Sequence, residues 1–97
     1  RYGFRLGEVE AGDPASAVRI APEWRGASPP SAEVRVTRRA GVDLNPLNPG
    51  DPGTRERLAA YVWADQRERL ERLEAALDIA AGMPVDMARG DAADWLE

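Results

Sequence analysis

The segment most informative about the fold is Gly41-Val42-Asp43-Leu44-Asn45-Pro46, a short apolar run that ends in an acid and continues into Asn-Pro. This order is typical of a buried strand that delivers one carboxylate to a loop. A second segment, Val85-Asp86-Met87-Ala88-Arg89-Gly90-Asp91-Ala92, also ends in an acid and enters an apparent helix. Because open α/β sheets bind ligands outside the carboxyl ends of their strands, the two segments predict an α/β architecture with a nucleotide crevice.

Helical patterns lie between these two segments. Asp51-Pro52 is a helix start signal, and the helix is expected to run through Leu58, Tyr61 and Val62. From Asp65 an apolar stripe recurs at steps of three and four residues, which predicts a second helix that ends near Gly82, a left-handed cap, and Pro84. The stripe consists of Leu70, Leu73, Leu77 and Ala80. A short strand over Val85–Ala88 and a helix capped by Asp91 follow.

The region before residue 41 has the pattern of short strands and loops. Tyr2–Glu10 and Ala17–Ile20 alternate apolar and polar residues on either side of a turn-like Ala11–Pro14, which predicts two antiparallel strands. Pro22–Pro30 is too rich in Pro and Gly for regular structure, and Trp24 is its expected anchor. Glu33–Thr37 alternates again, which predicts one strand, or two short ones, leading to Asp43.

Composition excludes several kinds of chemistry. The 97 residues contain no Cys and no His, so thiol chemistry, disulfides, ordinary zinc sites and imidazole catalysis are excluded within them. All 13 basic residues are Arg, which excludes a lysine Schiff base and a P-loop lysine. A pI near 4.9 makes nucleic acid and anionic membranes poor partners. Without a signal peptide or a long apolar run, and with Arg as its first residue, the chain is expected to be an internal fragment of a longer cytoplasmic protein.

Four motifs together resemble an uncharacterised bacterial family, domain of unknown function 2332. They are Pro22-Glu23-Trp24-Arg25-Gly26 with Pro29-Pro30, Arg39-Ala40-Gly41-Val42-Asp43-Leu44-Asn45-Pro46-Leu47, Val62-Trp63-Ala64-Asp65-Gln66, and Gly90-Asp91-Ala92. The resemblance covers nearly the whole chain. Ala64 departs from the family pattern, which usually has Pro there, and this softens the break between the two helices.

The resemblance implies a glycine-rich loop before this chain, similar to the first motif of S-adenosylmethionine-dependent methyltransferases. It further implies that Asp43 contacts ribose hydroxyls and that Asp91 receives the adenine amine. Asn45 and Ala92, their neighbours, complete the expected cofactor-binding set. From the residues alone another reading stays open, because Asp43 and Asn45 also suit a proline-flanked turn and Asp91 also suits a simple helix N-cap.

The resemblance thus implies a fragment of a Rossmann-like, methyltransferase-like α/β sheet, with a β-hairpin and Pro-rich loop insertion over residues 1–40. Residues 41–97 form its strand-helix-helix-strand-helix portion. The function expected is that of an S-adenosylmethionine-dependent methyltransferase-like protein with an unknown acceptor and unknown catalytic residues. The alternative is a non-catalytic scaffold or interaction module. We expect the isolated fragment to be inactive and to self-associate through open strand edges. Trp63 and Trp95 are expected in the core.

Overall fold

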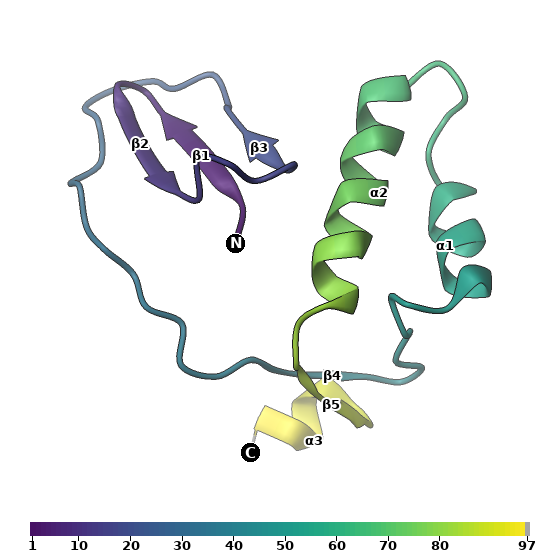
Figure 1. Cartoon of the computed structure of the whole chain (residues 1–97). Helices are drawn as coiled ribbons and strands as arrows, with labels where there is room; N and C mark the ends of the chain where they lie inside the picture. Colours follow the sequence, from purple (N-terminus) through teal and green to yellow (C-terminus); the bar gives the residue numbers. More distant parts are fainter. Residues whose placement is uncertain (97) are drawn as a thin grey trace.

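The computed structural model describes residues 1–96 and is a mixed α/β structure with two small sheets (Figure 1). Glu97, the last residue of the expected 41–97 unit, lies outside the described residues. The elements in chain order are β1 (Gly3–Leu6), β2 (Val9–Gly12), β3 (Arg19–Ile20), β4 (Ala40–Asp43), α1 (Pro52–Ala59), α2 (Arg67–Ala81), β5 (Asp86–Arg89) and α3 (Ala92–Leu96).

The first sheet is built on a tight hairpin of β1 and β2. Leu6 pairs with Val9, so the turn is Gly7-Glu8, and Gly7 has a φ of 66°. Two-residue hairpin turns of type II′ need positive φ at their first position, which glycine adopts without steric cost. A β-hairpin is therefore present within residues 1–40, but between other strands than the sequence predicted. The expected turn at Ala11–Pro14 between the predicted strands is wrong, because Tyr2–Glu10 folds back on itself instead of forming one strand.

The third strand of this sheet, β3, pairs with β1 in parallel, in the order β2-β1-β3. The expected antiparallel pairing of Ala17–Ile20 is therefore wrong. The chain reverses twice to reach this position, and Asp13 shapes the second reversal by accepting a hydrogen bond from the Ala15 amide at 2.9 Å. Val18, which precedes β3, is 1% exposed and is the most buried apolar side chain of the described residues.

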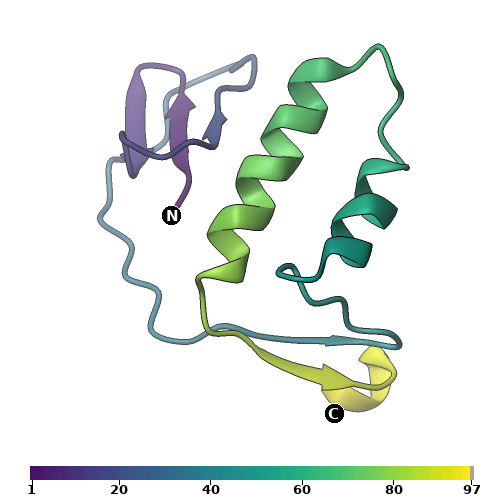
Figure 2. The same cartoon turned by 45° about the vertical axis from the view of Figure 1, so that its right-hand side comes forward.

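The second sheet consists of β4 and β5, which run parallel with Ala40 opposite Asp86 and Asp43 opposite Arg89. The connection between them contains α1 and α2 (Figure 2). Two adjacent parallel strands joined through helices agree with the expected α/β class. The second strand begins one residue later than the sequence predicts.

Local signals set most of the helix ends. Asp51 caps α1 as expected, with its Oδ1 accepting from the Gly53 amide at 2.9 Å. The helix ends at Ala59, before the predicted Val62. In α2 the predicted apolar stripe is the least exposed face, with Leu77 buried and Leu70, Leu73 and Ala80 half-buried. Gly82 ends this helix with a φ of −89°, so the expected left-handed cap is wrong.

Residues 21–39 connect the two sheets without any strand or helix. The predicted strand over Glu33–Thr37 is therefore wrong. Within this segment Trp24 lies against Gly7, and its Nε1 donates to the Ala27 carbonyl at 2.9 Å. Trp24 thus holds the start of the segment on the hairpin turn, although its ring stays partly exposed.

The second sheet has little cover. In Figures 1 and 2, α1 and α2 run side by side away from the strand pair instead of across its face. Of the helices in the described residues, α3 is the one that packs on this sheet, against β4. A self-contained globular monomer of 10.6 kDa exposes about 5,500 Å² of surface, whereas this chain exposes 7954 Å². Two helix layers covering a doubly wound sheet are not seen within residues 1–96.

Candidate functional site

The candidate site lies where β4 and β5 end. Because the strands are parallel and in register, their carboxyl ends meet at one edge of the sheet. The Gly90 amide donates to the Asp43 carbonyl at 3.0 Å and closes the ladder at this edge. The loop after Asp43 and the loop after Arg89 are therefore neighbours. The two segments that the sequence singled out are brought together.

Asp43 is the last residue of β4 and its side chain is exposed. Its Oδ1 accepts a hydrogen bond from the Asn45 amide at 2.8 Å. This is an Asx turn, so Asp43 and Asn45 do form the turn that the residues alone suggested. Within the described residues the other carboxylate oxygen accepts no hydrogen bond from the protein. It can accept hydrogen bonds from a ligand.

Arg89, the last residue of β5, joins the end of its strand to the loop after β4. Its Nε donates to the Leu44 carbonyl at 3.0 Å, and one terminal nitrogen donates to the Asn45 side-chain oxygen at 3.4 Å. Sequence reasoning missed this residue. The available signal was its position, an arginine at the end of the second strand and directly before Gly90-Asp91. In a parallel pair that position lies beside the end of the first strand.

Asp91 and Ala92 begin the short helix α3. Asp91 Oδ1 accepts from the Ala93 amide at 2.8 Å, as expected for an N-cap. The amide of Ala92, as the first residue of the helix, has no intrahelical acceptor. Both residues are exposed. The four expected cofactor-binding residues thus lie at the end of β4 and at the start of α3, on neighbouring segments, and their binding role stays a prediction.

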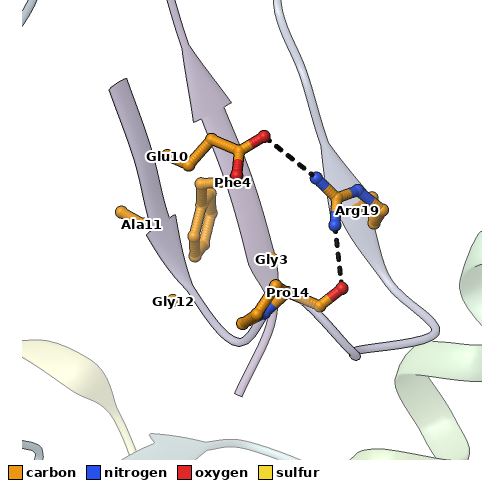
Figure 3. Close-up of a pocket in the computed structure, with 7 residues that line it drawn as sticks. All are labelled: Gly3, Phe4, Glu10, Ala11, Gly12, Pro14 and Arg19. Atoms are coloured by element: carbon orange, nitrogen blue, oxygen red, sulfur yellow. Dashed lines mark hydrogen bonds and ion pairs between the residues drawn. The ribbon is translucent and has the colours of Figure 1, made fainter. Parts of the chain in front are cut away.

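A separate hollow of about 190 Å³ lies on the first sheet (Figure 3). Its lining is formed by Gly3, Phe4, Glu10, Ala11, Gly12, Pro14 and Arg19. The Arg19 guanidinium lies 3.9 Å from a Glu10 carboxylate oxygen and donates to the Pro14 carbonyl at 2.9 Å. Since both partners are acceptors of its own sheet, Arg19 is already engaged. The hollow offers an aromatic ring and small residues but no uncommitted charge.

Two further properties bear on function. In the part of the chain that the structure describes, no group of three or more acidic side chains is arranged to hold a metal ion. None of the helices over residues 1–96 has the length and apolar character needed to cross a membrane.

Comparison with known proteins identifies the family. No curated protein and no solved structure matches the chain. One family model, described as "Uncharacterized protein conserved in bacteria (DUF2332)", matches residues 1–97. The match spans every motif on which the resemblance rested. The chain therefore belongs to DUF2332, a family of uncharacterised bacterial proteins.

Proposed function

We propose that this chain is part of a Rossmann-like domain that binds S-adenosylmethionine in a methyltransferase-like protein whose acceptor is not known. The observation that carries the proposal is the parallel register of β4 and β5, which sets Asp43 beside the loop that contains Asp91. In open α/β sheets this edge is where nucleotides bind. The architecture of this edge supports the proposal, whereas the family, described as uncharacterised, supplies no activity.

Asp43 is the proposed ribose ligand. A carboxylate accepts two hydrogen bonds at once, and a ribose presents two adjacent hydroxyls. One oxygen of Asp43 is used by the Asn45 amide, and the other is open to solvent. The Asx turn therefore orients the carboxylate while leaving it able to accept from the sugar. On this proposal the turn and the ligand role are compatible.

Asp91 and Ala92 are the proposed adenine ligands. The second carboxylate oxygen of Asp91 accepts from the exocyclic amine, while its first caps α3. The Ala92 amide donates to a ring nitrogen, since it has no acceptor within the helix. Acceptor and donor side by side match the amine and adjacent nitrogen of adenine.

On this proposal a further strand lies beside β4, on the edge that does not face β5. The ladder hydrogen bonds run from Asp86 N to Arg39 O and from Gly90 N to Asp43 O, so the backbone groups of Ala40 and Val42 in β4 point to its other edge. On the proposal that edge pairs with a strand that ends in the glycine-rich loop, whose amides hold the amino-acid end of the cofactor.

A non-catalytic interaction role is the second candidate. It is favoured by the large exposed surface of the chain and by apolar side chains on the second sheet and α3, where Met87 is 49% and Leu96 77% exposed. A protein that keeps this fold as a scaffold needs the same packing partners and no cofactor. Cofactor binding therefore separates the two candidates.

The test is calorimetric titration of S-adenosylmethionine into the full-length protein. Asp43→Ala is expected to weaken binding by about 1–3 kcal/mol, because it leaves the ribose hydroxyls without their charged acceptor. Asp43→Asn keeps an acceptor and recovers part of the loss. Asp86→Ala is the matched control, since Asp86 lies at the opposite end of the strand pair. The 97-residue chain alone is expected to bind weakly or not at all.

Two results contradict the proposal. One is unchanged affinity in both Asp43 variants with the fold intact by circular dichroism, which returns Asp43 to the role of a turn residue. The other is micromolar binding by the isolated chain, which means that the cofactor site has been misplaced.

A further inference from the structure

Arg89 and Asp43 are placed to form an ion pair, yet they do not form one within 4 Å. They are register partners in parallel strands, so their side chains leave the same face of the sheet. The guanidinium instead donates to two neutral acceptors, the Leu44 carbonyl and the Asn45 side-chain oxygen. Arg89 thus leaves the second carboxylate oxygen of Asp43, the one that does not accept from Asn45, available to a ligand.

The same bonds restrain the loop after β4. Leu44 is 70% exposed, so its side chain contributes little packing to hold this loop in place. Asn45 is held at two points, its backbone amide by Asp43 Oδ1 and its side chain by Arg89. Of these restraints, those from Arg89 come from the neighbouring strand and therefore fix the loop relative to the sheet.

We propose that Arg89 is a positioning residue for a diol-binding carboxylate. It holds the loop Leu44-Asn45 so that Asp43 directs its second oxygen to a pair of ribose hydroxyls. This inference rests on the proposed function and names the ligand class more closely, as a nucleoside with an unphosphorylated vicinal diol. Since the guanidinium is committed to the loop, a ribose phosphate meets the Asp43 carboxylate without a compensating cation.

The experiment compares two ligands in the full-length protein, S-adenosylhomocysteine and its 2′,3′-dideoxy analogue, by calorimetry. The ratio of their affinities reports the diol contact alone, because a general loss of fold weakens both ligands equally. In Arg89→Ala the ratio is expected to fall about fivefold, which is the net effect of one typical hydrogen bond. Arg89→Lys keeps one donor and is expected to recover part of the ratio.

Arg38→Ala is the matched control. Arg38 Nε pairs with Asp86 Oδ2 at 3.2 Å and so joins the same two strands at their other end. Its removal is expected to leave the ratio unchanged. Amide hydrogen exchange supplies an independent measure, since Arg89→Ala should speed exchange at Asn45 and Arg38→Ala should not.

The outcomes are distinct. Failure of the wild-type protein to bind S-adenosylhomocysteine overturns the proposed function and the diol role together. Binding by the wild type with an unchanged ratio in Arg89→Ala overturns the role of Arg89 alone. An equal loss for both ligands in Arg89→Ala also overturns it, because that residue then supports the fold and not the diol contact.

Discussion

The two sheets of this protein differ in how far residues close to them in the chain complete and cover them. The first sheet joins three strands within residues 3–20, and its local turns complete it. It buries Val18 and is touched at its turn by Trp24. The second sheet joins strands more than forty residues apart in the chain, and Met87 at its centre is half exposed.

The difference follows mainly from strand direction, because an antiparallel hairpin forms most of the first sheet, with one short parallel pairing of β3 on β1, whereas the second sheet is parallel throughout. A hairpin satisfies its hydrogen bonds with a two-residue turn, and an antiparallel sheet tolerates one wet face. A parallel pair needs a long connection and cover on both faces. In this protein the candidate site is on the sheet that residues 1–96 leave uncovered. The proposed binding site therefore depends on the region that the described residues cover less completely.

The largest expected effect concerns the oligomeric state of the chain in solution. We expect the 97-residue chain to self-associate through the second sheet, burying more than ~1,000 Å². Met87→Arg, on that sheet, should shift the population toward monomer in sedimentation velocity, whereas Arg5→Glu, an exposed change in β1, should not. A wild type that stays strictly monomeric at high concentration and unfolds cooperatively would contradict this expectation, because the second sheet is then stable by itself.

The next effect is on the first sheet. Gly12 has a φ of 76°, and a Cβ there would lie 2.0 Å from the Tyr2 carbonyl oxygen. Gly12→Ala is expected to destabilise this sheet by about 3 kcal/mol or more, since backbone strain and a backbone clash act together. Gly26→Ala is the control, because Gly26 has a φ of 88° and open space around it. Urea unfolding followed by tryptophan fluorescence measures both. Equal losses would mean that the close approach at Gly12 relaxes freely.

A smaller effect compares two valines. Val18 is 1% exposed and Val85, just before β5, is 42% exposed. Val18→Ala is expected to cost about 1–3 kcal/mol, and Val85→Ala about 0.5 kcal/mol or less. Chemical denaturation of the two variants checks the order. A larger loss for Val85→Ala would show that the second sheet is covered in solution.

The smallest effect concerns the helix pair. Arg55 and Asp78 join α1 to α2 through a 2.7 Å ion pair whose side chains are 33% and 72% exposed. Asp78→Ala is expected to cost about 0.5 kcal/mol, because solvent screens such pairs. Arg55→Ala should cost slightly more, since Arg55 also donates to the Pro49 carbonyl. Thermal melts of the helical circular dichroism signal test the order of the two losses. Equal losses in Asp78→Ala and Arg55→Ala would mean that the hydrogen bond to the Pro49 carbonyl contributes nothing to stability.

Sequence patterns predicted those parts of the fold that depend on near neighbours. The apolar stripe of α2 and the caps at Asp51 and Asp91 are determined within one helical turn, and the structure confirms them. The two strands at the candidate site were also predicted. The pairing of the other predicted strands was not predicted correctly. Glu33–Thr37 alternates well but has no partner strand, and alternation alone does not supply one.

The same limit applies to the site and to burial. Asp43 and Asp91 could be located because each ends a recognisable segment. The hydrogen bonds of Arg89 could not be located, because each joins Arg89 to a residue more than forty positions earlier in the chain. Trp63 is 76% exposed and Trp95 47%, against the expectation of core positions. Burial of a large aromatic ring depends on which elements face it, and this is a property of the tertiary structure.

The irregular segment over residues 21–39 has a consequence for how the protein varies between relatives. It is tied down at Trp24, at Val34, whose carbonyl accepts from Arg1 at 2.5 Å, and at Arg38. Doubling the length of a flexible connection costs only about 0.6 kcal/mol of closure entropy. Insertions and deletions between these ties should therefore accumulate without disturbing either sheet. We therefore expect that a change in the length of this segment moves the hairpin sheet and leaves the geometry around Asp43 unchanged.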